Sequence, residues 1–232
     1  MSSAPTFSGF PKEGLQFLQD LAANNNREWF KAHENDYADF LLAPGQAFVI
    51  ALGERLKSIS PRIQYDPQTH GSGSIMRIYR DMRFSKDKSP YHTYLRIIFW
   101  EGQKKKTDNP AFYFSIDEGA AVVFAGLHMF PKNTLDAYRA AVLHPERGAQ
   151  LESALAAVRQ AGCYEIGGAT NKHVPPGYPA EHPRAGLLLN TGLWAMSPKI
   201  ETPQLMSPEL VDVCYQHCRG MAPLQQWLAH LT

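Results

Sequence analysis

The sequence has few cysteines, no long apolar run and almost no net charge. Its 232 residues include three cysteines, and the formal net charge is +1. The unevenly spaced Cys163, Cys214 and Cys218 are too few for a disulfide framework, so we expect a reducing compartment. No stretch approaches the roughly 18 consecutive apolar residues of a membrane helix, and the first residues lack the pattern of a secretory signal. We therefore predict a cytoplasmic protein that makes no membrane contact.

The composition also limits the classes of partner. A net charge of +1 is low for a domain dedicated to nucleic acid, because such domains usually gather Lys and Arg on one face. Nucleic acid is therefore the least favoured partner. Hydrophobic residues make up 44% of the chain and charged residues 19%, which is typical of an ordered globular protein. Any basic site must consequently be local, and nothing in the composition indicates the oligomeric state.

The pattern of apolar residues predicts one α+β domain over residues 1–232, an antiparallel β meander packed with N-terminal and C-terminal helices. A helical part is expected at about 11–58, a mainly β centre at about 74–130, and a mixed helical part at about 131–232. In the first part, one helix follows Pro11, a second begins at Arg27 and ends before Pro44, and a third runs toward Pro61.

The centre and the last part contain the remaining expected elements. Four short strands rich in β-branched or aromatic residues are expected at 75–80, 94–100, 112–116 and 121–127. Asp117-Glu118-Gly119 predicts a hairpin turn between the last two. Further on, we expect helices at 131–143, 148–161, 208–219 and 224–231, a strand at 187–194, and a long loop at 162–184.

The most informative stretch is residues 80–91, where cationic, hydroxyl and aromatic side chains alternate on a short loop. Such donors can converge on phosphate or carboxylate oxygens. We expect the two guanidinium groups to bind an anion through paired hydrogen bonds, with a point charge, two hydroxyl donors and an orienting carboxylate beside them. These candidates are Arg80, Arg83, Lys88, Ser85, Tyr91 and Asp81.

The same stretch has a purely structural interpretation. Asp81 and Asp87 can pair with the neighbouring arginines and lysines, and structural ion-pair networks often resemble sites. The loop would then be a salt-bridged brace. A second polar loop, residues 171–183, contains Lys172, which we include among the candidate ligand residues because it can join the first loop in space. An ordinary surface loop explains these residues equally well.

Sharper chemical motifs do not occur in the sequence. Cys214, His217 and Cys218 share one helix face, but a zinc site needs a fourth ligand, so buried thiols are the favoured interpretation. Phosphate-binding, dinucleotide-binding and hydrolase signatures are missing. The sequence therefore predicts neither a metal nor a cofactor, and it does not decide whether the protein is an enzyme.

Residues 80–91 read Arg-Asp-Met-Arg-Phe-Ser-Lys-Asp-Lys-Ser-Pro-Tyr, which resembles the signature of the conserved family called domain of unknown function 2461. Pieces similar to that pattern occur at 7–10, 25–30, 176–178 and 223–228. The chain departs from it at Lys172-His173, where the family has Lys-Arg, and at Asn190-Thr191, where the family has a basic residue. The resemblance implies membership and general architecture but no reaction.

Three hypotheses from different classes follow. The first is a protein that binds a small phosphate- or carboxylate-bearing ligand through residues 80–91. The second is a non-enzymatic interaction module in which that loop is a structural brace. The third is nucleic-acid binding, for which affinity would fall steeply with salt.

Overall fold

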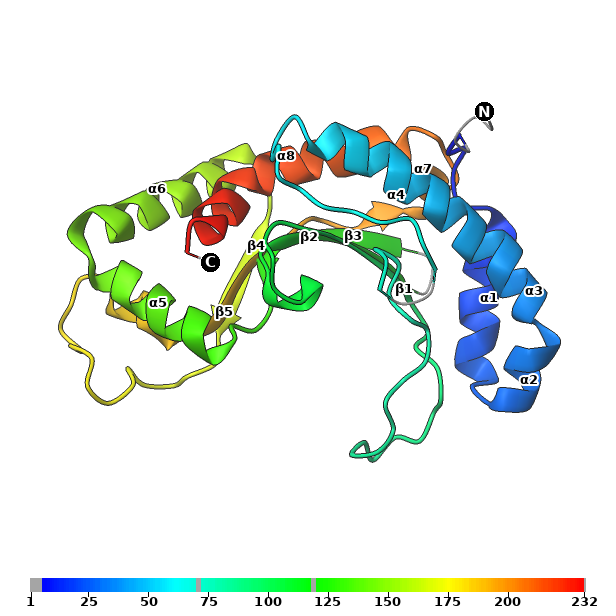
Figure 1. Cartoon of the computed structure of the whole chain (residues 1–232), viewed down its shortest axis with the longest axis horizontal. Coiled ribbons are helices and arrows are strands. Elements are labelled where there is room, and N and C mark those ends of the chain that lie inside the picture. The colour runs from blue at the N-terminus through cyan, green and yellow to red at the C-terminus, as the bar shows by residue number, and fades with distance from the viewer. Residues whose placement is uncertain (1–5, 70–71, 118–119, 232) are drawn as a thin grey trace. The chain divides into compact units, whose positions relative to one another are not determined.

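The computed structural model of the protein describes residues 6–69, 72–117 and 120–231 (Figure 1). The residues cluster into two compact units, which we describe separately. Unit 1 comprises Met1–Phe99, Tyr113–Val122 and Lys199–Tyr215, and unit 2 comprises Trp100–Phe112, Val123–Pro198 and Gln216–Thr232. The expectation of a single domain stays a prediction. The hairpin turn expected at Asp117-Glu118-Gly119 lies partly outside the described residues.

A six-stranded sheet confirms the α+β class. The strand order is β1-β2-β3-β5-β4, with β6 pairing with β3, so the first three strands form the predicted meander. The pairs β3–β5, β3–β6 and β4–β5 are antiparallel. The strands are β1 (Leu95–Trp100), β2 (Ala111–Asp117), β3 (Ala120–Leu127), β4 (Glu165–Ala169), β5 (Asn190–Met196) and β6 (Ile200–Glu201).

The N-terminal part of unit 1 is helical, as predicted. Asn26 caps the second helix, because its side-chain oxygen accepts a hydrogen bond of 2.9 Å from the amide of Trp29. The helical segments are α1 (Lys12–Ala23), α2 (Arg27–Ala32), α3 (Glu34–Tyr37), a π-helical turn η1 (Ala38–Leu42) and α4 (Ala43–Leu56).

The predicted break before Pro44 is wrong, because helical backbone continues through η1 into α4. Pro44 has no N–H with which to bond the carbonyl of Phe40, four residues earlier. The chain adopts a wider π turn here instead of ending, and Pro44 takes a place in the first turn of α4, where its missing donor is tolerated. Phe48 and Val49 of α4 are fully buried, which favours continuing the helix.

Aromatic rings form much of the core of unit 1. The ring centroids of Phe48 and Phe114 lie 4.6 Å apart, and Phe10 stacks on Phe114 at 6.0 Å. A second cluster contains Phe17, whose centroid is 5.8 Å from that of Tyr37. All of these side chains are buried, so their aromatic character serves packing.

Unit 2 is built from two complete helices, most of the C-terminal helix α8 (Leu210–Ala229), parts of the central strands and a pair of antiparallel strands. Its other helical segments are α5 (Lys132–Leu143), α6 (Pro145–Ala161) and the 3₁₀ turns η2 (Lys106–Asp108) and η3 (Ala185–Leu189). Strand β4 falls in the segment that we predicted to be loop. Glycine is unusual inside strands, so the composition of β4 does not indicate a strand. Gly167 is needed here because it lies under the ring of Trp194, where no Cβ fits.

The chain ends with α7 (Thr202–Leu205) and α8 (Leu210–Ala229). The two C-terminal helices that we predicted at 208–219 and 224–231 are one helix with Pro223 inside it. Buried side chains continue past this proline on the same helix, from Cys218 to Leu224 and Leu228. Burial of this continuous apolar face outweighs the hydrogen bond that the proline removes.

We predict that Gly14→Ala destabilises the protein. A Cβ at Gly14 of α1 would collide with the backbone carbonyl of Phe40 in η1. This clash can be relieved only if α1 and η1 move apart. Overpacking of this kind costs about 1–3 kcal/mol, although helix propensity alone favours Ala by about 1 kcal/mol. Urea unfolding measures the difference. The control is Gly186→Ala, where a Cβ meets no atom within 4 Å and the change should stay within about 0.5 kcal/mol. A Gly14→Ala variant as stable as the wild type would contradict the close approach.

Candidate functional site

The basic stretch forms the end of a long extended loop of unit 1. Isolated bridges join Ile75 to Ile97 and Tyr79 to Tyr91, and the amide of Arg80 donates to the carbonyl of Pro90 at 2.9 Å. The strand expected at 75–80 is therefore replaced by two separate bridges. Ile75 and Ile78 are both buried although three residues apart, and this spacing breaks the two-residue period of a regular strand.

Within this loop, the charged residues pair with one another. The guanidinium of Arg83 donates to both carboxylate oxygens of Asp81, with Nε–Oδ1 and Nη2–Oδ2 distances of 3.0 and 2.7 Å. Arg80 forms an ion pair with Asp87, and the Lys88 ammonium donates to the carbonyl of Met82 at 3.0 Å. These contacts are the geometry of the salt-bridged brace.

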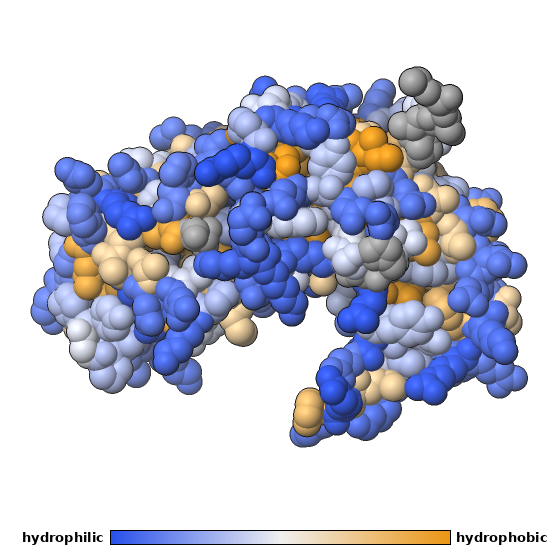
Figure 2. All heavy atoms as spheres, in the orientation of Figure 1, coloured by the Kyte–Doolittle hydropathy of each residue, from blue (hydrophilic) through white to orange (hydrophobic). Residues whose placement is uncertain are grey.

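The ion pairs of the loop are exposed in different degrees. The Arg83 side chain is 78% exposed, whereas that of Arg80 is 24% exposed. Figure 2 shows mostly hydrophilic residues on the projecting loop, with a small hydrophobic group at its tip. Phe84 is 95% exposed. Exposed ion pairs contribute little to stability, so the Arg83 pair orders the loop locally without adding much to the free energy of unfolding.

Both aspartates of the loop are held in their charged form. The side chain and amide of Arg83 lower the pKa of Asp81 from 3.8 to about 2. The hydroxyl and amide of Ser89, and then Arg80, hold the pKa of Asp87 far below its usual value. At neutral pH each aspartate therefore offsets the charge of its arginine partner.

A pocket of about 400 Å³ lies at the base of this loop. It is bordered on one side by α2 and α3 and on the other by the two arms of the loop. Three cationic side chains and one carboxylate line it, together with aromatic and apolar groups. The lining residues are Arg27, Phe30, Lys31, Glu34, Tyr79, Arg80, Met82, Pro90 and Tyr91.

One asparagine joins the helical wall of the pocket to the loop. The side-chain amide of Asn25 donates to the carbonyl of Tyr91 at 2.9 Å and accepts from the amide of Tyr91 at 3.1 Å. An amide side chain can do both at once, so Asn25 pairs with Tyr91 as a neighbouring strand would. The Phe30 ring stacks on the Tyr91 ring with centroids 4.2 Å apart. These contacts fix α2 against residues 90–91.

Of the residues that the sequence singled out, Arg80 and Tyr91 line the pocket. Asp81, Arg83 and Lys88 take part in the pairing within the loop, and the amide of Ser85 donates to the carbonyl of Met82 at 3.3 Å. The binding role of all these residues stays a prediction.

Three pocket residues were missed by the sequence analysis: Arg27, Lys31 and Glu34. They are exposed, and their spacing of four and then three residues places them on one face of consecutive helical turns. This spacing was a readable signal, but only the Asn25–Tyr91 pairing shows that this face borders the basic loop. Among the described residues, neither Arg27 nor Lys31 takes part in an ion pair.

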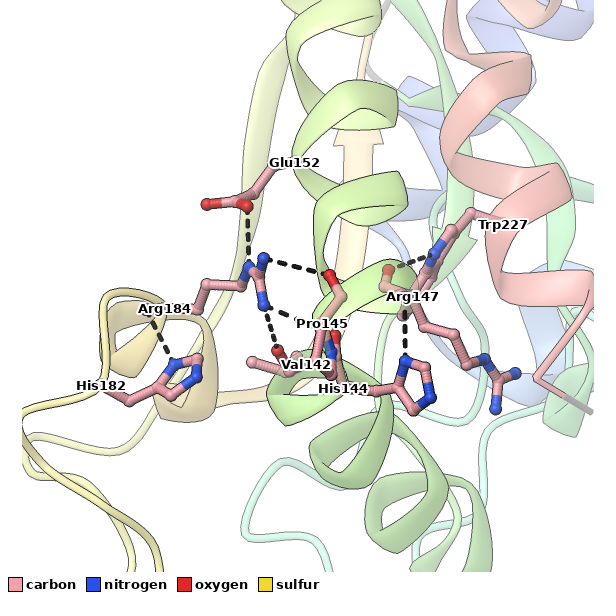
Figure 3. A network of polar contacts seen from close by, with 8 residues as sticks. All are labelled: Val142, His144, Pro145, Arg147, Glu152, His182, Arg184 and Trp227. Atoms are coloured by element: carbon pink, nitrogen blue, oxygen red, sulfur yellow. Dashed lines mark hydrogen bonds and ion pairs between the residues drawn. The ribbon is translucent and has the colours of Figure 1, made fainter.

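Lys172 lies in the loop of unit 2 and is exposed, and its participation in the site stays a prediction. The C-terminal end of that loop is anchored by Arg184 (Figure 3). Arg184 donates to a carboxylate oxygen of Glu152 at 2.7 Å and to the carbonyls of Val142 and Pro145 at 3.3 Å each. Its side chain thus satisfies carbonyl groups near the end of α5, which is a structural role.

The two cysteine side chains on α8 are buried, as the sequence predicts. Cys214 and Cys218 are buried thiols, and burial raises the pKa of Cys218 far above its usual value. The His217 Nδ1 atom lies 3.4 Å from the hydroxyl of Tyr164. In the part of the chain that the structure describes, no three His, Cys, Asp or Glu residues are grouped to hold a metal ion.

A family model described as conserved hypothetical protein (DUF2461) matches residues 13–227. The chain belongs to this family. The resemblance seen in residues 80–91 is thereby confirmed, and the match includes α2, the basic loop and the pocket between them. The search of curated proteins found no match to this DUF2461 protein. Among the described residues, none of its helices combines the length and apolarity needed to cross a bilayer.

We predict that Arg83→Gln returns the pKa of Asp81 from about 2 toward its ordinary value of 3.8. Because the folded pKa is depressed, the stabilising contribution of Asp81 is present above pH 3.8 and is lost as the pH falls through 2. Carboxyl carbon chemical shifts in a pH titration measure this change. Asp87 is the internal control, since its pKa depends on Ser89 and Arg80. Identical Asp81 titrations in both proteins would contradict the bidentate pair.

We predict that Asn25→Ala lowers the free energy of unfolding by about 1–3 kcal/mol, because the buried backbone of Tyr91 loses both partners. Hydrogen exchange at the Tyr91 amide should accelerate in this variant. Asn35→Ala is the matched control, since Asn35 is an exposed residue of α3. If exchange at Tyr91 were unchanged in Asn25→Ala, Asn25 would not be the connection between α2 and the loop.

Proposed function

We propose that this protein binds a small anionic ligand, carrying phosphate or carboxylate, in the pocket between α2, α3 and the basic loop. The observation that carries the proposal is the lining of the pocket, in which Arg27, Lys31 and Arg80 outnumber the single carboxylate of Glu34. Three cations on the wall of one concave site attract an anion and can donate several charge-assisted hydrogen bonds to it.

The proposal gives the loop a different role from the one the sequence suggested. The bidentate contact with Asp81 occupies Nε and Nη2 of Arg83, and Arg83 does not line the pocket. Arg80 lines the pocket, and its pairing with Asp87 holds its guanidinium at the pocket edge. We infer that Arg80 binds the ligand and that Asp81, Arg83 and Lys88 keep the loop in shape.

A second candidate function is a protein interaction module. It is favoured by the exposure of Phe84, which projects from a loop whose charges are paired with one another. Exposed aromatic residues are common anchors at protein interfaces. In that case residues 80–91 would present Phe84 to a partner, and the pocket cations would have no ligand.

We predict that a small anion raises the melting temperature of the wild type. The panel contains inorganic phosphate, sugar phosphates, nucleotides and dicarboxylates. Saturation at 100 times Kd adds about 2.7 kcal/mol, which corresponds to a rise of about 5–10 °C for a chain of this length. The rise should be lost in Lys31→Ala and in Arg27→Ala, because each variant removes one cation from the pocket wall.

Two controls make this test specific. Arg77→Ala removes a positive charge from an exposed position outside the pocket lining, so it should preserve the response to ligand. Arg83→Ala should reduce the response less than Lys31→Ala does. An equal response in wild type and Lys31→Ala would contradict binding in this pocket. Failure of every anion to raise the melting temperature would favour the interaction module.

A further inference from the structure

The pocket contains an aromatic surface that a simple anion would not use. Tyr79 lines the pocket, and 58% of this residue is exposed to solvent. Its ring centroid is 5.4 Å from that of Tyr91 and 6.1 Å from that of Phe30, which are themselves buried. Tyr79 is thus supported by two inner rings, while much of it remains open to solvent.

The size of the pocket also exceeds the needs of a bare phosphate. A volume of about 400 Å³ lies in the range of sites for small organic molecules, roughly 300–1,000 Å³. The cations Arg27, Lys31 and Arg80 account for an anionic group on the ligand. Apart from Glu34, the rest of the wall is apolar or aromatic and suits a flat ring; it is formed by Phe30, Tyr79, Met82, Pro90 and Tyr91.

Glu34 adds a third requirement. Its carboxylate lines the same pocket and only accepts hydrogen bonds when it is ionised. Beside a ligand that carries nothing but negative charge, Glu34 would be repulsive. A ligand that also presents hydroxyl or amino donors would satisfy it, so the pocket combines cations, an acceptor and an aromatic surface.

We propose that the anionic ligand is a mononucleotide, whose base stacks on Tyr79 while its phosphate lies among Arg27, Lys31 and Arg80. Glu34 accepts a hydrogen bond from a sugar hydroxyl or from an amino group of the base. This inference rests on the proposed function, because it names the ligand class of the same pocket. A free nucleotide and the end of a single-stranded nucleic acid share this chemistry, and the net charge of +1 favours the free nucleotide.

The test compares ligands that share a phosphate and differ in the ring. Isothermal titration calorimetry measures the affinities of the wild type for AMP, UMP, ribose 5-phosphate and inorganic phosphate. Stacking of a base on an aromatic side chain is worth about 1–3 kcal/mol, so at least one nucleotide should bind about 5- to 150-fold more tightly than ribose 5-phosphate. Tyr79→Ala should remove this difference and leave the affinity for ribose 5-phosphate unchanged.

Two matched variants separate stacking from other effects. Tyr79→Phe keeps the ring, so it should preserve the preference for nucleotides. Phe84→Ala removes another exposed aromatic residue of the same loop, which lies outside the pocket lining, and should change nothing. Loss of the preference in Phe84→Ala, or its survival in Tyr79→Ala, would overturn the assignment of the base to Tyr79.

The outcomes also distinguish this inference from the proposal beneath it. If ribose 5-phosphate binds as tightly as the nucleotides, the pocket takes an anion but no base, and only the further inference fails. If only a dicarboxylate binds, the further inference fails and the proposed function stands, whereas both fail if no anion binds. A 5′-phosphorylated oligothymidine that binds more tightly than the nucleotides, with affinity falling steeply in salt, would overturn the assignment to a free nucleotide.

Discussion

The pairing of the Asn25 side chain with the backbone of Tyr91 is the contact on which the candidate site depends. It joins residues 66 positions apart in the sequence and replaces the backbone partner that a regular strand would supply. Without it, α2 would be held to the loop mainly by the stacking of Phe30 on Tyr91. Ring stacking fixes the relative orientation of two segments less strictly than hydrogen bonds do. The cations of α2 and the arginine of the loop border one pocket because this pairing sets their positions.

The distribution of charge in the loop explains why an apparently strong basic motif is weaker than its composition suggests. Asp81 and Asp87 each neutralise an arginine, and both stay ionised at neutral pH because their pKa values are lowered. Arg27 and Lys31 are separated from these aspartates in sequence, and in the part of the chain that the structure describes neither forms an ion pair. The basic residues within 80–91 thus mark a loop whose charges pair with one another, and its neighbour α2 supplies most of the positive charge of the pocket.

Much of the fold was predictable because it is encoded by local patterns. The periodicity of apolar residues identified α1, α5 and the strands β1 to β3, whose ends lie within a few residues of those expected. Rules about single residues failed where packing outweighed them. Helical backbone continues past Pro44 and Pro223 because buried faces extend on both sides of each proline. Strand β4 was not predicted, because Gly167, which makes room for the ring of Trp194, is not a residue typical of strands.

The candidate site was predictable only in part, for a similar reason. Arg80 and Tyr91 were found because they belong to one contiguous stretch, whereas Arg27 and Lys31 required a long-range contact that no local pattern reveals.

The position of Arg80 has a consequence for how binding would affect the loop. The same guanidinium borders the pocket and pairs with Asp87, and it also donates to the carbonyl of Ser89 at 3.3 Å. An anion that enters the pocket competes with Asp87 for this group, or shares it through the remaining donors of the guanidinium. Competition would leave Asp87 with Ser89 as its remaining partner and loosen the loop, whereas sharing would tighten it. The five donors of an arginine permit sharing, whereas the three donors of a lysine on a flexible stem favour exchange. With an arginine at this position, the loop would keep its shape if an anion bound.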